Sequence, residues 1–209
     1  NYYKKNNFKG KLIFVSIKNY QIVRKKIRNI YLKSKINDEN MSFVYQLAKK
    51  LNINDKSFIK SVNSFKGLEH RHEIFLKKKG IKFINDSKAT SFEATKHALM
   101  SNKNIYWILG GLPKKKDYFY LKNFKKIIIK AYIIGKNSSF FKKQIQKYIP
   151  YTISRNMMSA INSIYEDIKM SKDTEKTILL SPAAASFDQF KNFENRGIYF
   201  KNLIMKKFK

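Results

Sequence analysis

From about residue 80 onward, short apolar runs alternate with stretches of helical periodicity, and this alternation constrains the fold more than any other feature of the sequence. Four apolar runs have the length and composition of buried strands: 81–84, 105–109, 131–135 and 177–181. Helical periodicity covers 91–101, 118–126, 138–148, 156–170 and 198–208. Strands that alternate with helices favour an α/β fold, Rossmann-like, with a mostly parallel sheet that helices flank on both faces.

The earlier part of the chain has a different pattern. Residues 12–17 ("LIFVSI") are predicted to form a strand, and 40–51 and 55–65 to form helices. The first of these helices is expected to bury one apolar face, made of Met41, Val44, Tyr45, Leu47, Ala48 and Leu51. Residues 67–73 ("GLEHRHE") are expected to form a connection between this part and the sheet.

The net charge of the chain is large, but it does not by itself identify a function class. The net charge is +31, with 45 basic residues against 14 acidic ones, which is typical of a nucleic-acid binder. However, only five of the basic residues are arginine, and the lysines are spread along the whole chain, as a general compositional drift would spread them. We therefore expect no specific nucleic-acid partner, and a phosphate-bearing substrate suits the same positive field.

Composition also bears on the compartment. At 43% apolar residues the chain has enough apolar surface to bury a core, and it has no cysteine. No run of apolar residues is long enough to span a membrane, and the first residues lack the apolar core of a signal peptide. These features predict a cytoplasmic protein. We also expect a monomer, although no feature of the composition fixes the oligomeric state.

In folds of this class, ligands bind at the carboxyl ends of the strands, so the loops at 85–90, 110–117 and 181–188 are the ones to inspect. In the first loop, Thr90 and Glu93 have the spacing of a capping box, and a helix that begins there would favour an anion. Lys88 adds a positive charge, and the carboxylate of Asp86 is able to accept a hydrogen bond from a ribose hydroxyl or a metal-bound water. A polar turn with a good cap is an equally good interpretation of this loop alone.

The other two loops offer further groups for an anion. Gly110 and Gly111 allow close approach to the backbone, and the lysines at 114–116 suit a carboxylate or phosphate, although an exposed turn explains them as well. In the third loop, Ser186 is a candidate donor to an oxyanion. Phe187, Phe190 and Phe193 are expected to form an apolar wall there, and Gly197 to end a helix.

Several motifs are absent from the sequence. It has no P-loop, no G-x-G-x-x-G, no H-E-x-x-H and no G-x-S-x-G. His70 and His72 are two residues apart, but no third ligand is evident beside them, so no metal site is predicted within the chain. If the protein uses a nucleotide, the main phosphate cradle is expected outside these residues.

The three loops, in this order and spacing, resemble one family. "FKGLEHRHE", "FINDSKATS", "GGLPKKKD" and "LSPAAASFDQFKNFENRG" are similar to the later part of the Mur ligases that add D-glutamate to UDP-N-acetylmuramoyl-L-alanine. The resemblance implies two domains: the C-terminal part of a central ATP-binding domain at 1–67, and a D-glutamate-binding Mur ligase C-terminal domain at 68–209. It also implies an ATP-dependent, amide-forming enzyme of peptidoglycan precursor synthesis, active in cell-wall biogenesis, cell shape and division.

The resemblance implies roles for individual residues. On the ATP side it implies Asn37, Asn40, Arg71, Asp86 and Lys88, of which Asp86 and Lys88 are the catalytic pair. For D-glutamate it implies Thr90, Lys114, Ser186, Phe187 and Phe193. The resemblance implies a reaction in which ATP phosphorylates the substrate carboxylate to an acyl phosphate, the D-glutamate amine attacks it, and phosphate leaves.

The family also uses an N-terminal domain for the UDP-sugar peptide, a P-loop and Mg²⁺ ligands, which the resemblance places upstream of these residues. We therefore expect that the 209 residues alone do not form the amide. Two alternatives stay open: a Mur or folylpolyglutamate-type ligase with another amino-acid specificity, and a basic nucleic-acid-binding module.

Overall fold

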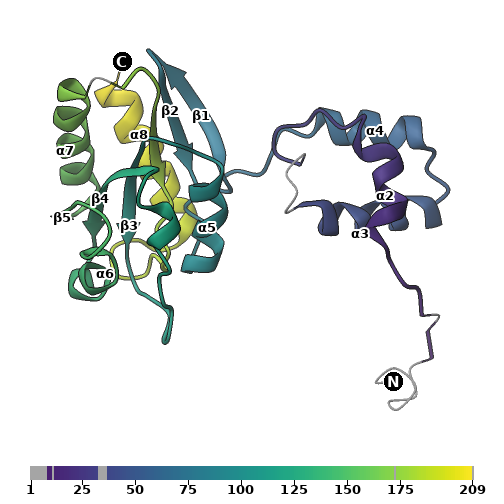
Figure 1. The fold of residues 1–209 in the computed structure, drawn as a ribbon, viewed down its shortest axis with the longest axis horizontal. Helices are drawn as coiled ribbons and strands as arrows, with labels where there is room; N and C mark the ends of the chain where they lie inside the picture. Colours follow the sequence, from purple (N-terminus) through teal and green to yellow (C-terminus); the bar gives the residue numbers. More distant parts are fainter. Residues whose placement is uncertain (1–8, 11, 33–36, 172, 209) are drawn as a thin grey trace. The chain divides into compact units, whose positions relative to one another are not determined.

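The computed structural model describes residues 9–10, 12–32, 37–171 and 173–208. The chain divides into two compact units, Asn1–Gly67 and Leu68–Lys209 (Figure 1). No helix among the described residues is long and apolar enough to cross a membrane.

The described residues of the first unit form three helices, α2 (Ile17–Arg24), α3 (Asn37–Lys50) and α4 (Asp55–Ser64). Their buried side chains form one small core: Tyr20, Val23, Ile27, Met41, Tyr45, Ala48, Phe58 and Val62. The strand predicted at 12–17 is wrong, because residues 12–16 have no regular structure and Ile17 begins α2. Ser16 caps that helix by accepting a hydrogen bond from the Lys18 N–H, and no strand of the described residues lies beside 12–16 to pair with them.

Helix α3 has two apolar faces instead of the single one that was predicted. Met41, Tyr45 and Ala48 are buried in the core of the first unit. Val44, Leu47 and Leu51 are 49%, 60% and 64% exposed, because they project from the other side of the helix. The first unit therefore carries an apolar surface strip, and such strips commonly mark a contact with another part of a protein.

The second unit is built on a six-stranded sheet with the order β1-β2-β6-β3-β4-β5. The strands are β1 (Glu73–Lys78), β2 (Ile81–Asn85), β3 (Ile105–Gly110), β4 (Ile128–Ile134), β5 (Tyr151–Arg155) and β6 (Lys176–Leu180). Only β1 is antiparallel to its neighbour, and all other pairs are parallel. The predicted α/β class and the four central strands are thus confirmed.

The two strands that the sequence did not reveal, β1 and β5, are the edges of the sheet. Edge strands are only partly buried, so they do not need a continuous apolar run. Most residues of β1 are half-buried and two are lysines, and β5 has a single buried residue. The apolar-run signal is therefore weakest where the sheet ends.

Helices pack on both faces of the sheet (Figure 1). One core cluster joins Ile84, Trp107 and Leu109 of the sheet to residues of α5 (Phe92–Met100) and α6 (Ser138–Ile145). The cluster on the other face joins Phe83 and Tyr106 to residues of α7 (Met157–Met170) and α8 (Phe193–Lys207). Successive strand residues alternate between the two clusters, as the pleat requires.

Two predicted helices differ from the observed ones. Only a 3₁₀ turn, Lys122–Phe124, forms within 118–126, because buried aromatic side chains hold that segment against the core: Phe119 stacks on Phe92 at 4.5 Å between ring centroids. Helix α8 begins at Phe193, five residues earlier than predicted. Gly197 does not end a helix but lies inside α8, where a Cβ would come 2.2 Å from Nδ1 of His70.

Candidate active site

The three loops that the sequence singled out follow β2, β6 and β3, which are neighbours in the sheet. The three strands are parallel, so their carboxyl ends meet at one edge. Asp86 follows β2, Ser181 follows β6 and Gly111 follows β3. The expectation that these loops lie at the carboxyl ends of strands is therefore confirmed, and the three strands are neighbours in the sheet.

Asp86 is almost completely buried at this edge, with 8% of its surface exposed. Its Oδ2 accepts a hydrogen bond from the Ser181 hydroxyl at 2.6 Å, and its Oδ1 accepts one from the backbone N–H of His72 at 3.0 Å. Burial raises the pKa of the Asp86 carboxyl to about 6 from its ordinary value of 3.8, although these two hydrogen bonds and the charge of Arg71 lower it. A buried carboxyl with a raised pKa is common at functional sites.

The raised pKa predicts how Asp86 affects stability. The folded state favours the protonated carboxyl, so the stability that this proton contributes is present below pH 3.8 and is lost as the pH rises through about 6. A shift of about two pKa units corresponds to about 3 kcal/mol. We expect Asp86→Asn to raise the free energy of unfolding at pH 8 by about 1–2 kcal/mol, because an amide avoids the buried charge but replaces only part of the hydrogen bonding. The gain should vanish near pH 4.

Urea unfolding of both proteins between pH 4 and 8, followed by the fluorescence of Trp107, measures this difference. Glu93→Gln is the matched control, because the Glu93 side chain is 78% exposed and its neutralisation should cause little pH-dependent change. An Asp86→Asn variant that is equally destabilised at pH 4 and at pH 8 would contradict the prediction.

Lys88 and Thr90 lie between Asp86 and α5. The backbone N–H of Lys88 donates to the carbonyl of His70 at 2.9 Å, and its Nζ lies 3.7 Å from the centre of the Phe193 ring. No acid forms an ion pair with Lys88 in the part of the chain that the structure describes. A half-buried ammonium held over an aromatic ring, without an acid beside it, is suited to bind an anion.

The capping box predicted at Thr90 and Glu93 is wrong by one residue. Ser91 is the N-cap of α5, and its hydroxyl accepts from the N–H of Ala94 at 3.4 Å. Asp117, from the loop after β3, accepts from the N–H of Phe92 at 2.9 Å. Thr90 therefore precedes the cap, and its hydroxyl is not used to start the helix.

The loop after β3 is joined to the loop after β6. Leu112 and Ala185 exchange two backbone hydrogen bonds, of 2.9 and 3.0 Å. Gly111 has a φ of +132°, and a Cβ there would come 2.3 Å from the carbonyl oxygen of Ala185, so the close backbone approach expected of this glycine is confirmed. Lys114 lies beyond this contact, on the exposed part of the loop.

The apolar wall predicted from three phenylalanines does not form. Ser186 is 2% exposed, and its carbonyl accepts from the N–H groups of both Gln189 and Phe190, which makes a tight turn. Because of this turn the rings diverge: Phe187 is 70% exposed, Phe190 packs against Tyr199, and Phe193 packs against His70. Only Phe193 reaches the loop that carries Lys88.

Arg196 is a central residue of this edge that the sequence analysis did not identify. Its side chain is 1% exposed, and its guanidinium donates to the hydroxyl and carbonyl of Ser87 at 3.0 and 2.8 Å and to the carbonyl of Ala184 at 3.0 Å. Burial lowers the pKa of Arg196 to about 10, although the charge of Asp188 raises it. One side chain thus ties the loop after β2 to the loop after β6.

A signal for Arg196 was present in the composition. The chain uses lysine almost everywhere and keeps only five arginines. A planar guanidinium is able to donate to several carbonyls at once, and an ammonium on a flexible stem is a poor replacement for it. However, Arg28, Arg71 and Arg155 are exposed, so the rarity of arginine did not by itself single out Arg196 as a buried, multiply bonded group.

The residues predicted on the ATP side come from both units. Asn37 and Asn40 lie on α3 of the first unit, where the Asn37 amide donates to the carbonyl of Tyr31 at 2.7 Å and Asn40 is exposed. Arg71 is exposed in the second unit and is close enough for its charge to lower the pKa of Asp86. The remaining predicted residues lie on the loops at the carboxyl edge, except Phe193, which is the first residue of α8: Asp86, Lys88, Thr90, Lys114, Ser186 and Phe187.

Known proteins resemble this chain in sequence, although no family model matches it. The UDP-N-acetylmuramoylalanine–D-glutamate ligase of Wolbachia sp. subsp. Brugia malayi (strain TRS) is 39% identical over 170 residues, which are 81% of this chain and 34% of that protein. The ligase of the same name from Mesorhizobium japonicum is 44% identical over 140 residues, 67% of this chain and 30% of that protein. The chain spans about a third of the length of these relatives.

Solved structures resemble it in fold. MurF from Acinetobacter baumannii superimposes with a TM-score of 0.63 at 12% identity, over 83% of this chain and 38% of that one. The bifunctional folylpolyglutamate synthase/dihydrofolate synthase from Yersinia pestis CO92 gives a TM-score of 0.50 at 9% identity, over 80% of this chain and 39% of that one. The fold is therefore that of Mur ligase-like proteins, and over most of its length the chain is a relative of the UDP-N-acetylmuramoylalanine–D-glutamate ligases.

Proposed function

We propose that this chain is the later part of an ATP-dependent ligase that joins D-glutamate to UDP-N-acetylmuramoyl-L-alanine through an acyl phosphate. The observation that carries the proposal is the sequence similarity, 39% identity over 170 residues, to proteins with that name. The three loops that carry the family-like motifs also lie at one edge of the sheet. We assign the reaction to the cytoplasm and its product to peptidoglycan synthesis, and thus to cell shape and division.

In this proposal the two units belong to different domains. Residues 1–67 are the C-terminal part of a central ATP-binding domain, and 68–209 are the D-glutamate-binding domain. The exposed strip of Val44, Leu47 and Leu51 on α3 supports the first assignment, since it offers an apolar surface for further segments of such a domain.

ATP, with Mg²⁺, supplies the phosphoryl group that activates the substrate carboxylate. Lys88 suits the phosphate side, because its ammonium is held over the Phe193 ring and has no acid partner in the described part of the chain. Arg71 is exposed nearby, and Asp86 offers a carboxylate to a ribose hydroxyl. Asn37 and Asn40, on α3 of the first unit, are assigned to the adenine of ATP. The Mg²⁺ ligands are assigned to upstream segments of the ligase.

The D-glutamate side is assigned to Thr90, Lys114, Ser186, Phe187 and Phe193. Thr90 is free of the helix cap and Lys114 is exposed, so a hydroxyl and an ammonium are available to the two carboxylates of the amino acid. Ser186 is buried in the loop that Arg196 holds through Ala184, which fixes its backbone. A positioned donor of this kind typically contributes about 2.7–4 kcal/mol to the stabilisation of a transition state.

A chimera tests the proposal. Residues 68–209 would replace the matching region of the Mesorhizobium japonicum relative, and ADP formation would be measured with UDP-N-acetylmuramoyl-L-alanine, Mg²⁺, ATP and D-glutamate. We expect D-glutamate-dependent ADP release from the chimera and none from the 209-residue chain alone. Lys114→Ala and Ser186→Ala in the chimera should each reduce kcat/KM for D-glutamate about 100-fold, the loss expected for one positioned donor.

The control variant is Lys143→Ala on α6, which removes an exposed lysine side chain outside the predicted site residues and should leave kcat/KM unchanged. A folded chimera that releases ADP equally well with another amino acid would instead favour a sibling ligase of different specificity. Unchanged D-glutamate dependence in both Lys114→Ala and Ser186→Ala would show that the pocket is assigned to the wrong residues.

A further inference from the structure

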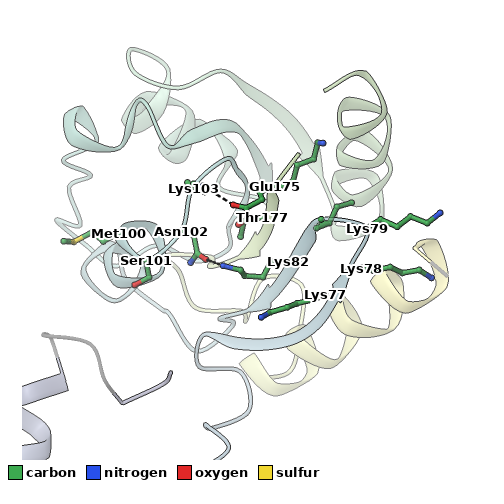
Figure 2. A pocket seen from close by; sticks show the side chains of 13 residues that line it. Lys77, Lys78, Lys79, Lys82, Met100, Ser101, Asn102, Lys103, Glu175 and Thr177 are labelled. Atoms are coloured by element: carbon green, nitrogen blue, oxygen red, sulfur yellow. Dashed lines mark hydrogen bonds and ion pairs between the residues drawn. The ribbon is translucent and has the colours of Figure 1, made fainter. Parts of the chain in front are cut away.

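A cavity of about 680 Å³ opens at the edge of the sheet opposite the candidate active site. It lies at the amino ends of β2 and β6 and beside the C-terminal end of α5 (Figure 2). Six lysines and one acid line it: Lys77, Lys78, Lys79, Lys82, Lys103, Lys176 and Glu175. Nothing in the proposed ligase reaction uses these residues.

Two of these lysines are register partners across the β1–β2 hairpin. Lys77 pairs with Lys82 in the antiparallel ladder, so both side chains leave the same face of the sheet. Figure 2 shows them pointing toward the side where Asn102 lies, whereas Lys78 and Lys79 point the other way. Like charges directly opposite each other destabilise a strand pair unless an opposite charge lies between them.

The described residues provide little negative charge to offset this pair. Lys82 donates to the neutral Oδ1 of Asn102 at 3.2 Å, and Lys77 has no acid partner in the described part of the chain. Glu175, the acid in the lining, is 3.0 Å from Lys103. The cavity therefore keeps an excess of positive charge.

The lysine content of the chain does not by itself explain this cavity. Forty of the 209 residues are lysine, but six of the thirteen residues that line the cavity are. An exposed lysine pair on α6, Lys142 and Lys143, represents the ordinary lysine-rich surface, because neither of the two lines this cavity.

We propose that this cavity binds a small anion that carries two or more phosphate groups, held chiefly by Lys77 and Lys82. Its volume lies in the range of small-molecule sites, about 300–1,000 Å³. Lysine ammonium groups bind phosphates as point charges. The lysines gather at one open cavity, which favours a compact anion over a nucleic acid, since a nucleic acid needs an extended basic track.

A chain of polar contacts leads from the cavity toward Asp86. Asn102 accepts from Lys82, its amide lies 3.0 Å from Nε2 of His72, and the backbone N–H of His72 donates to Asp86. His72 therefore reports on the cavity. The chain has only three histidines, so the ring signal of His72 is easily resolved by NMR and assigned with a His72→Gln variant.

The test is titration of the 209-residue chain with inorganic pyrophosphate, followed by calorimetry and by the histidine ring signals. We expect saturable binding with a shift of the His72 signal. Lys77→Gln/Lys82→Gln should weaken binding at least about tenfold and abolish the shift, whereas Lys142→Gln/Lys143→Gln should change the affinity less than about twofold. Lys77→Gln alone is a second variant for the case in which the double variant does not fold, because it removes only one exposed side chain.

Equal weakening in the two double variants would mean that general charge causes the binding, and it would overturn the proposal. Absence of saturable pyrophosphate binding would overturn it too. The proposal would also be overturned if a single-stranded oligonucleotide bound more tightly than pyrophosphate and both double variants weakened its binding equally. None of these outcomes bears on D-glutamate use by the chimera, so the two proposals fail separately.

Discussion

Arg196→Met is expected to lower the free energy of unfolding of the second unit by about 3 kcal/mol. The substitution removes the donors to the buried carbonyls of Ser87 and Ala184, and each unsatisfied buried acceptor costs about 1–3 kcal/mol. Loss of the buried charge offsets part of this cost. Urea unfolding followed by Trp107 fluorescence reports on this unit, because the buried Trp107 is the only tryptophan of the chain.

Two further variants make this test sharper. Arg196→Lys retains the charge but cannot reach both loops at once, so it should lose at least half as much stability as Arg196→Met. Arg155→Met removes an exposed arginine from the same unit and should change stability by no more than about 0.5 kcal/mol. Wild-type stability in Arg196→Met would show that Arg196 does not hold the loops together.

Gly197→Ala should destabilise the second unit by about 3 kcal/mol or more, although alanine favours a helix over glycine by about 1 kcal/mol. The new Cβ would come 2.2 Å from Nδ1 of His70 and 2.9 Å from both side-chain polar atoms of Asn85. These two side chains cannot easily retreat, because Asn85 Nδ2 lies 2.8 Å from the His70 ring and 3.0 Å from Glu73. The Lys201 ammonium holds Glu73 in turn, with its Nζ 2.6 Å from Oε1 of the carboxylate.

The matched control for Gly197→Ala is Asn195→Ala, at an exposed position two residues earlier in α8, which should change stability by no more than about 0.5 kcal/mol. Urea unfolding of both variants provides the comparison. A Gly197→Ala protein that is more stable than the wild type would mean that helix propensity outweighs the contact with His70.

The fold was predictable from the sequence where strands are buried on both faces of the sheet. The runs at β2, β3, β4 and β6 are apolar because these central strands are covered on both faces, so their sequence alone marks them. Strands β1 and β5 lie at the edges, where polar residues are tolerated, and the local pattern does not distinguish them from connections. In the first unit, "LIFVSI" is apolar without being a strand, since a strand also needs a partner.

The candidate site was predictable as a set of loops but not as a set of contacts. Local spacing and the resemblance picked out the residues around Asp86, Gly111 and Ser186. Neither indicated that burial would raise the pKa of Asp86 to about 6, since burial depends on how distant segments pack; the hydrogen bonds from Ser181 and from the backbone of His72 lower this pKa but do not offset the burial. The predicted wall of phenylalanines failed because one tight turn after Ser186 sends the rings in different directions.

The sequence by itself determined the α/β class, the central strands and the three loops, because each of these depends on periodicity or on residues close together in the chain. The tertiary structure decided which groups meet: Arg196 with Ser87, 109 residues apart, and Asp86 with Ser181, 95 apart. It also decided that Gly197 is a packing position and that Lys77 and Lys82 face the same cavity. Such contacts depend on how distant segments pack, and a local pattern carries no information about its distant partner.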